Sequence, residues 1–333
     1  MLNAKIEQSK NDLASSGLLQ HTTARLRFAN RYRKSSGSMR RQMVALPERK
    51  NRLLHELNRA EKLGATSDGK LIFLFEYFHN SAVMRELGRL RELTFRAVGE
   101  GTGKLRDIDC YDQNYKHIVL WDPAATEIVG AYRIGEAHTL PVENCRKDLY
   151  TNELFSYRDS FNPIFTKGVE LGRSFIQPQY WRKRGLDYLW QGIGAYLINH
   201  SNTRYLFGAV SISNDYPSLA KQQIVGHYKY FHSSKSIREY ACAINPFQLD
   251  RATYESRRGL SREQSNQELK ASLRRQGVSL PVLYKHYVEL CDAQGVNFID
   301  FNVDPDFAFC VDGLILVDLQ HIKAAKRCRY LSL

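Results

Sequence analysis

The sequence predicts an α+β protein of 333 residues, an α/β/α sandwich with helices on both sides of a mixed central sheet. From about residue 70 onward, strand-sized apolar runs alternate with amphipathic helical patterns. The first strand patterns are joined by short turns, which is typical of hairpins, and the later ones are separated by helices, which is typical of crossovers. No apolar run approaches the roughly 20 residues that a bilayer-spanning helix needs.

In the first half of this domain, residues 71–75 form a continuous apolar run of strand length. Residues 82–98 place apolar side chains at helical spacing, which predicts an amphipathic helix. Residues 117–121 and 128–134 are two strand patterns separated by Asp-Pro-Ala-Ala-Thr, a turn sequence that indicates a hairpin.

The second half continues the alternation of strands and helices. Its charged stretch at 250–276 has few apolar residues, so we expect this part of an insertion at about 236–278 to lie outside the core. The predicted strands are residues 168–176, 204–213, 298–301 and 314–318, and the predicted helices are residues 186–199, 216–231 and 280–291.

The first 60 residues are strongly basic, with 13 Lys and Arg against 4 Asp and Glu. We expect residues 1–68 to be a basic helical or partly disordered arm and residues 69–333 to be the folded domain. Within the arm, residues 21–34 mix cations with apolar side chains, which suits a helix lying on an anionic membrane. No nucleic-acid recognition motif accompanies this charge, so we expect no nucleic-acid partner.

Six scattered cysteines include no CxxC pair and have no histidine at metal-ligand spacing. They predict reduced thiols and no metal site, and the N-terminus shows no signal-peptide pattern. We therefore expect a cytoplasmic protein, with peripheral contact at the inner face of the cell membrane.

Residues 168–185 predict an anion-binding loop between a strand and a helix. The strand ends at Pro178, and a basic loop follows, directly before an apolar helix. Free backbone N–H groups and the positive end of the helix dipole favour a phosphate at such a position, and Arg182, Lys183 and Arg184 add charge. The alternative is a basic turn with no ligand.

This loop resembles the acyl-carrier motif of the GNAT superfamily, P-x-Y-R-x-x-G-x-G/A. Trp181 interrupts the match, and Asp187 stands where the motif has Gly or Ala. An acid there would repel a pyrophosphate, which favours the single phosphodiester of acyl carrier protein over CoA. The resemblance implies no tightly bound cofactor, and it assigns phosphopantetheine binding to Gln177, Tyr180, Arg182, Lys183, Arg184 and Gly185.

A second set of residues follows the order R-x-x-x-F, D-x-x-D, a strand Arg and then E-x-x-R. This order resembles that of the acyl-homoserine-lactone synthases. The surrounding sequence resembles the hemolysin-like family, which includes the ornithine-lipid N-acyltransferases. The resemblance implies transfer of a 3-hydroxyacyl group from acyl carrier protein to the amine of an amino acid such as ornithine, in membrane lipid biosynthesis. The residues concerned are Arg91, Phe95, Asp109, Asp112, Arg133, Glu170 and Arg173.

Glu170 and Arg173 reach one pocket only if their strand bulges, because residues three apart in a regular strand face opposite sides. We therefore predict a bulge near Gly172, in a strand that splays from its neighbour. Glu170 is the expected general base, and the expected catalytic set is completed by Arg173, Asp109 and Asp112. The expected substrate-binding residues are Arg91, Phe95, Arg133 and Gly172.

Alternatives remain at this stage. The same acids and arginines also fit a purely structural ion-pair network. The glycine-rich residues 99–103 fit either a mobile loop over the acceptor pocket or a plain surface loop. The enzyme fits either the lipid N-acyltransferases or an autoinducer-type synthase, and a non-catalytic basic binding protein on the same scaffold is the third reading.

Overall fold

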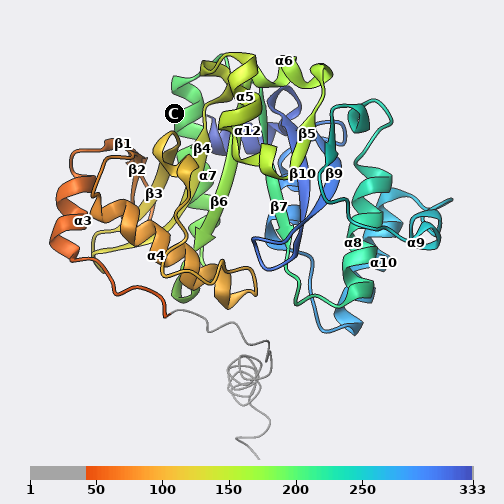
Figure 1. The fold of residues 1–333 in the computed structure, drawn as a ribbon, viewed down its shortest axis with the longest axis horizontal. Helices are drawn as coiled ribbons and strands as arrows, with labels where there is room; N and C mark the ends of the chain where they lie inside the picture. Colours follow the sequence, from red (N-terminus) through yellow and green to blue (C-terminus); the bar gives the residue numbers. More distant parts are fainter. Residues whose placement is uncertain (1–42, 332–333) are drawn as a thin grey trace, which may run out of the picture. The chain divides into compact units, whose positions relative to one another are not determined.

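The computed structural model describes residues 43–331, and its centre is a mixed eight-stranded sheet (Figure 1). The strands lie in the order β1-β2-β3-β4-β6-β7-β10-β9, and β5 pairs with β8 in a separate ribbon. The strand bounds are β1 Glu61–Ala65, β2 Leu71–Glu76, β3 Lys116–Asp122, β4 Glu127–Gly135, β5 Phe155–Tyr157, β6 Gly168–Ile176, β7 Tyr205–Ile212, β8 Ala241–Ala243, β9 Val296–Asp304 and β10 Cys310–Asp318.

Helices precede, connect and follow these strands. None of those between residues 43 and 331 is both long and apolar enough to cross a bilayer. Their bounds are α3 Lys50–Leu57, α4 Ala82–Ala97, α5 Val142–Asp148, α6 Asn162–Phe165, α7 Gly185–Asn199, α8 Ser218–Phe231, α9 Arg251–Glu255, α10 Arg262–Arg275, α11 Val282–Leu290 and α12 Ala324–Tyr330.

The sheet consists of two antiparallel groups that meet at one parallel pair. The strands β1, β2, β3, β4 and β6 pair antiparallel with one another, as do β7, β10 and β9. The pair β6–β7 is parallel and is connected through α7, as parallel pairing requires. The predicted change from hairpins to crossovers is confirmed.

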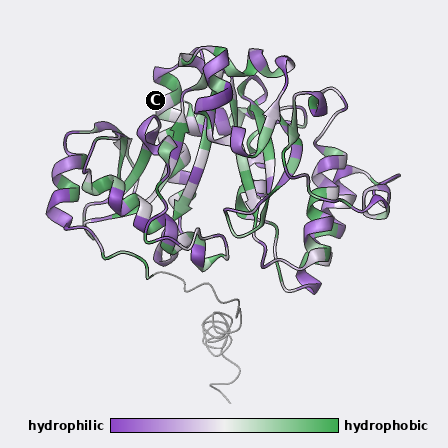
Figure 2. Cartoon of the chain, in the orientation of Figure 1, coloured by the Kyte–Doolittle hydropathy of each residue, from purple (hydrophilic) through white to green (hydrophobic). Residues whose placement is uncertain are grey.

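Alternation along the strands divides the buried side chains between two faces. In β2, Ile72 and Leu74 join a core with α7, α8, α10, α11 and α12, whereas Phe73 and Phe75 face α3 and α4. Beyond β6, the face opposite α7 is covered by residues 140–165 and the β5–β8 ribbon. Figure 2 shows the hydrophobic residues concentrated on the strands and on the helix surfaces that face them.

Two polar side chains fix the start of α4. The hydroxyl of Ser81 accepts a hydrogen bond from the backbone N–H of Met84, as an N-cap does. The carboxylate of Glu56, in α3, accepts from the backbone N–H groups of Ala82 and Val83. These bonds satisfy N–H groups that have no partner within the helix, and they join α3 to α4.

Two parts of the predicted organisation differ from the structure. Residues 50–65, expected in the arm, form α3 and the edge strand β1, so the sheet begins before residue 69. Within the charged stretch, Leu269 and Leu273 of α10 are buried in the α8 side of the core, so this stretch does not lie outside it. Two leucines four residues apart are enough to bury one face of α10.

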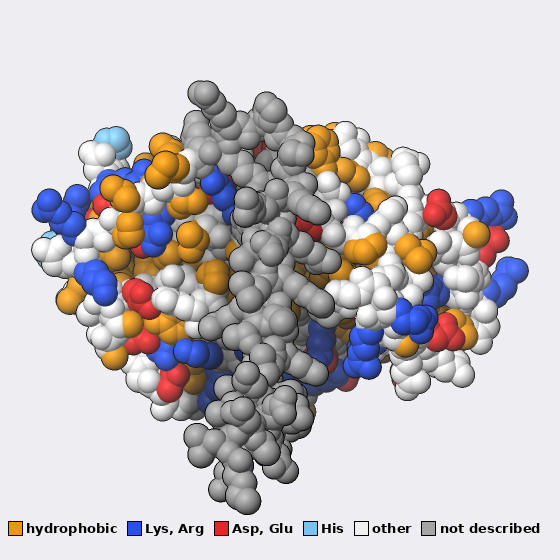
Figure 3. Space-filling view, turned by 90° about the horizontal axis from the view of Figure 1, so that it is seen from below, with side chains coloured by type: hydrophobic (Ala, Val, Ile, Leu, Met, Phe, Trp, Pro, Cys, Tyr) orange, Lys and Arg blue, Asp and Glu red, His pale blue; other side chains and the backbone are white. Residues whose placement is uncertain are grey.

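The membrane contact predicted for residues 21–34 lies outside the described residues. On the face shown in Figure 3, basic, acidic and apolar side chains are interspersed over the described part of the molecule.

Candidate active site

The sheet opens between β6 and β7. The two strands pair only where Gly168–Glu170 lie beside Tyr205–Phe207, although both continue for several residues beyond. Directly after the last pair, a Cβ atom at Gly208 would lie 2.1 Å from the carbonyl oxygen of Leu171, so only glycine fits there. The predicted splay of this strand is confirmed.

β6 also bulges at the opening. Gly172 pairs with Arg133, and Phe175 pairs with Ala131, so Arg173 and Ser174 together oppose one residue of β4. The predicted bulge is therefore confirmed, but its left-handed residue is Arg173, with φ 49°, and not Gly172. Such a conformation costs a non-glycine residue about 1 kcal/mol, which the contacts of the Arg173 side chain offset.

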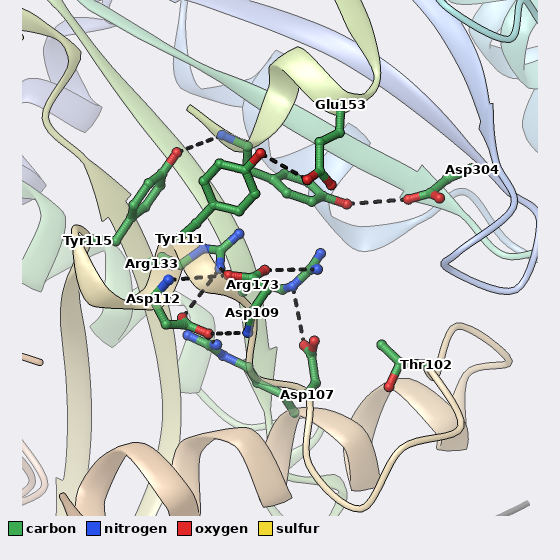
Figure 4. Close-up of polar contacts among 12 residues, drawn as sticks. Thr102, Asp107, Asp109, Tyr111, Asp112, Tyr115, Arg133, Glu153, Arg173 and Asp304 are labelled. Atoms are coloured by element: carbon green, nitrogen blue, oxygen red, sulfur yellow. Dashed lines mark hydrogen bonds and ion pairs between the residues drawn. The ribbon is translucent and has the colours of Figure 1, made fainter. Parts of the chain in front are cut away.

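The guanidinium of Arg173 is held by two aromatic rings and two acids. Its Cζ lies 4.5 Å from the ring centroid of Tyr150 and 5.1 Å from that of Phe307. Its Nε lies 3.2 Å from Asp107, and its Nη2 donates to Asp109 at 3.3 Å (Figure 4). Arg173 therefore stands on the same side of the sheet as Tyr150, at the edge where β6 leaves β7.

Beneath it lies a buried ion-pair network. Arg91 donates to Asp112 at 2.8 Å, and Arg133 donates to Asp109 at 2.6 Å and to Asp112 at 3.3 Å. Asp109 and Asp112 also cap the short 3-10 helix Cys110–Gln113 through each other's backbone N–H groups. Burial opposes ionisation of Asp112, but Arg91 and Arg133 outweigh burial and lower its pKa. These residues come together as the sequence predicts.

Three residues of this network, Arg91, Arg133 and Asp112, are fully buried. They therefore support the site from the protein interior. Phe95 is also buried and packs edge-on against Phe307, the ring beneath Arg173. Burial raises the pKa of the neighbouring Asp107. The positive charge of Arg173 lowers this pKa, but its effect is smaller than that of burial.

Glu170 lies on the same face but is enclosed. One of its oxygens accepts from the hydroxyl of Tyr115 at 2.7 Å, and the other accepts from the backbone N–H of Thr151 at 3.0 Å. Its side chain is 1% exposed, and burial raises its pKa to about 7, although the Tyr115 hydrogen bond and Arg133 act in the opposite direction. Each oxygen accepts one hydrogen bond, directly or through Tyr115, from the segment that carries Tyr150, so the carboxylate is enclosed by that segment.

The predicted anion loop precedes α7 as expected. Arg182, in a left-handed conformation with φ 65°, and Lys183 are exposed, and Gly185 opens the helix. A Cβ atom at Gly185 would lie 2.9 Å from Cδ1 of Ile176, so the end of that side chain would have to shift. Arg184 instead pairs with Asp187 at 3.2 Å.

Two residues assigned to phosphopantetheine stabilise the loop from within. The side-chain amide of Gln177 donates to the carbonyl oxygen of Ile128, and its backbone N–H donates to Val129 at 2.9 Å. The hydroxyl of Tyr180 donates to Glu127 at 2.6 Å. Both side chains are buried and are hydrogen-bonded within the protein.

The negative charge of Asp187 is compensated. Its carboxylate accepts from Arg329 of α12 at 2.6 Å and from the hydroxyl of Tyr330 at 2.9 Å, in addition to the Arg184 pair. Burial opposes its ionisation, but these hydrogen bonds lower its pKa. Asp187 is therefore not expected to repel a pyrophosphate, and it does not discriminate between CoA and acyl carrier protein.

The glycine-rich loop at 99–103 is tied to α4. The buried carboxylate of Glu92 accepts from the backbone N–H groups of Thr102 and Gly103, at 3.1 and 2.8 Å, and from the Thr102 hydroxyl at 2.6 Å. Gly99 packs against the carboxylate of Asp215, just beyond β7. The loop thus reaches from α4 to the end of the opened strand.

Four residues that were not predicted from the sequence surround the site. Tyr115 and Tyr150 enclose the guanidinium of Arg133, whose Cζ lies 4.9 and 5.3 Å from their ring centroids. Asp304 and Asp312 lie across the opening, on β9 and β10. Alternation within their strands indicated burial, but no spacing pattern links these residues to Arg173. Among residues 43–331, no three His, Cys, Asp or Glu side chains gather in a group that could hold a metal.

Comparison with known proteins agrees with this geometry. The chain is 29% identical over 305 residues to a glycine N(alpha)-acyltransferase of Bacteroides thetaiotaomicron, covering 87% of this chain and 89% of that protein. A glycine N(alpha)-acyltransferase of Phocaeicola vulgatus is 37% identical over 193 residues, which are 54% of this chain and 58% of that protein. An L-ornithine N(alpha)-acyltransferase of Brucella abortus is 30% identical over 145 residues, covering 38% and 50%.

Residues 90–191 match the acetyltransferase (GNAT) domain family. This span contains the ion-pair network, the bulge of β6 and the anion loop before α7. The chain is a GNAT-type N-acyltransferase. The GNAT fold and the N-acyltransferase activity implied by the resemblance are confirmed. The two relatives with the longer alignments are named for glycine, whereas the predicted example was ornithine.

Proposed function

We propose that this GNAT-type N-acyltransferase moves a fatty acyl group from a phosphopantetheine thioester to the α-amine of a small amino acid. Glycine is the first candidate acceptor and ornithine the second. The observation that carries the proposal is the opening of the sheet at Arg173: β6 leaves β7, bulges, and presents a guanidinium beside backbone groups released from the ladder.

The relatives support the order of the two acceptors. The glycine N(alpha)-acyltransferase of Bacteroides thetaiotaomicron aligns with 87% of this chain, and the L-ornithine N(alpha)-acyltransferase of Brucella abortus aligns with 38%. Since both names specify acylation at the α-nitrogen, the shared chemistry is N-acylation of an α-amino acid. The two acceptors differ in their side chains, so a competition experiment separates them.

The acceptor carboxylate is assigned to Arg173. A guanidinium binds a carboxylate through two parallel N–H groups, which adds direction to the charge. The Arg173 side chain is 11% exposed, whereas Arg133 behind it is fully buried. Nη2 of Arg133 has no hydrogen-bond partner among residues 43–331, so this side chain can strengthen the positive field at the same point.

The donor phosphate is assigned to the loop before α7. Arg182 and Lys183 are exposed there, at the positive end of a 15-residue helix. Acyl carrier protein and CoA both present a phosphopantetheine arm, so both are candidate donors. No tightly bound cofactor is needed for this transfer.

Attack of the amine on the thioester places negative charge on the carbonyl oxygen. Backbone N–H groups at the bulge of β6 are the proposed donors to that oxyanion, and one such donor contributes about 3 kcal/mol to transition-state stabilisation in other acyl-transfer enzymes.

A product that carries a fatty chain would enter a membrane. We therefore also propose that the basic N-terminal residues bring the enzyme to an anionic cytoplasmic membrane surface, where the product serves lipid biosynthesis.

The test is turnover by the full-length chain with a 3-hydroxyacyl carrier protein and, separately, with the matching acyl-CoA. Glycine and ornithine are supplied alone and in competition, thiol release is followed, and products are identified by mass. We expect an N-acyl amino acid, with glycine favoured. Homoserine, an amino acid with a γ-hydroxyl, is supplied as a third acceptor. A lactone formed from it would support the autoinducer-type synthase, and no thiol release with any amino acid would refute the proposed function.

A further inference from the structure

Two carboxylates face the opening of the sheet from the strands opposite Arg173. Asp304 is 4% exposed and Asp312 is 2% exposed. Asp312 pairs in register with Ser211 of β7, and Asp304 pairs with Cys310. None of the steps assigned above uses either acid.

Both acids lie on the side of the sheet that carries Arg173. The hydroxyl of Tyr150 donates to Asp304 at 3.3 Å, which is the dashed line to Asp304 in Figure 4. The ring of the same tyrosine stacks on the Arg173 guanidinium. In register, Asp312 shares a face with Ser211, which donates to it at 2.6 Å. The Tyr150 side chain therefore connects Arg173 to Asp304 across the opening.

Asp312 has neither a cation, as Asp109 and Asp112 do, nor a pair of short hydrogen bonds from oxygen and nitrogen donors, as Glu170 does. Asp109 and Asp112 each have a guanidinium nitrogen within 3.3 Å, and both oxygens of Glu170 accept strong hydrogen bonds. Asp312 has the Ser211 hydroxyl and the weak thiol donor of Cys310 at 3.8 Å, and no cationic nitrogen of residues 43–331 lies within 4.0 Å. A buried carboxylate in this position requires either a proton or an external cation.

A second, independent feature lies directly beside it. Asn302 of β9, fully buried, is the register partner of Asp312, so both side chains lie on one face. Its Oδ1 accepts from the backbone N–H of Asn245, but its Nδ2 has no hydrogen-bond partner within the described chain. An unpaired buried donor is costly, which indicates that a polar ligand group completes this region.

We propose that Asp312 binds the α-ammonium group of the acceptor amino acid and takes its proton before acyl transfer. This inference rests on the proposed function. It gives Asp312 the role that the sequence predicted for Glu170, and it places the acceptor across the opening, with its carboxylate on Arg173 and its nitrogen on β10. A metal ion fits the region less well, because the acids do not gather into a metal-binding group among residues 43–331.

The ammonium gives one proton to the Asp312 carboxylate and becomes a neutral amine. The amine attacks the thioester carbon, a C–N bond forms, and the C–S bond breaks. The second proton leaving the nitrogen goes to the thiolate, so that an amide and a thiol result, and the proton on Asp312 returns to solvent.

The surroundings of Asp312 set the pH at which it can accept this proton. Burial raises its pKa to about 7, whereas the hydrogen bond from Ser211 lowers it, Asp304 raises it and Arg173 lowers it. A carboxyl group with this pKa is about half ionised at neutral pH, so it can both accept and release a proton there. The other titratable groups facing it are Glu100, Tyr150, Tyr284 and Cys310.

The test is the pH dependence of kcat/KM for the acceptor, measured with acyl carrier protein thioester as donor. The wild type should lose activity below an apparent pKa near 7, and Asp312→Asn should lower kcat at least 100-fold. Two neighbouring variants should move the limb in opposite directions: Ser211→Ala to higher pH and Asp304→Asn to lower pH. A merely structural role for Asp312 predicts no such opposed shifts.

Thermal melts of every variant separate loss of folding from loss of chemistry, and the two neighbouring variants keep the test informative if Asp312→Asn does not fold. A limb that moves with Glu170→Gln, and not with the Ser211 and Asp304 variants, would overturn the inference in favour of Glu170. Failure of the wild type to acylate any amino acid would instead count against the proposed function itself.

Discussion

The guanidinium of Arg173 lies 4.5 Å from the ring centroid of Tyr150, and it is held there by a left-handed backbone at the bulge of β6. The regular alternation of a strand would have turned this side chain to the opposite face of the sheet. One strained residue thus places a cation where two strands part.

Arg173→Ala should raise KM for the acceptor about 10- to 100-fold, because a charge-assisted hydrogen-bonded pair contributes roughly 1.5–3 kcal/mol. KM for the thioester donor should change little. Arg173→Lys keeps the charge but loses the planar, two-pronged geometry, so we expect an intermediate KM. The measurement is steady-state kinetics with each substrate varied, and Arg251→Ala, at an exposed remote arginine, is the control. An unchanged acceptor KM in Arg173→Ala would remove this residue from carboxylate binding.

Asp112→Ala should destabilise the fold by about 3–5 kcal/mol, because it leaves the guanidinium groups of Arg91 and Arg133 buried without their shared partner. The matched control is Glu255→Ala, which breaks the exposed Arg251–Glu255 pair and should change stability by less than about 1 kcal/mol. Urea denaturation measures both. Equal losses in the two variants would contradict the network described beneath the site.

Much of the fold could be predicted because periodicity reports burial directly. The bulge was also predictable, since Glu170 and Arg173 share one face only if the strand is irregular. The left-handed residue could not be assigned, because sequence favours Gly172 there and the contacts of the Arg173 side chain decide otherwise. Asp312 was missed because its importance comes from having no cationic side chain beside it. Which side chains lie beside it depends on the pairing of strands whose residues are more than 100 positions apart in the sequence.

Glu170 should make stability fall as pH rises from about 4.5 to about 7. Its pKa in the folded protein is raised to about 7 from 4.5, so the folded state binds the proton more tightly. That contribution is present below pH 4.5 and is lost as pH approaches 7, by about 3 kcal/mol. Glu170→Gln mimics the protonated side chain, so wild type should lose stability relative to this variant across that window. Unfolding free energies at pH 4.5, 5.5 and 7.5 provide the measurement.

Glu136→Gln is the control of opposite sign for that experiment. Burial raises the pKa of Glu136, but hydrogen bonds from Tyr196 and Lys116 outweigh burial and lower it. Wild type should therefore lose stability relative to Glu136→Gln as pH falls below the ordinary glutamate range. The same slope in both comparisons would show that the enclosure of Glu170 does not control its titration.

Arg182→Ala combined with Lys183→Ala should raise KM for the thioester donor about 10-fold and make it less sensitive to salt. Both side chains are exposed at the start of α7, so their loss should leave thermal stability unchanged. The control is Lys285→Ala, which removes one positive charge from an exposed position of α11, away from this loop.

The measurement is KM for CoA and carrier-protein thioesters between 50 and 300 mM salt, over which the Debye length changes roughly twofold. A larger loss with the carrier protein would indicate that the two side chains contact the protein as well as its phosphopantetheine. An unchanged KM for both donors would place the phosphate elsewhere.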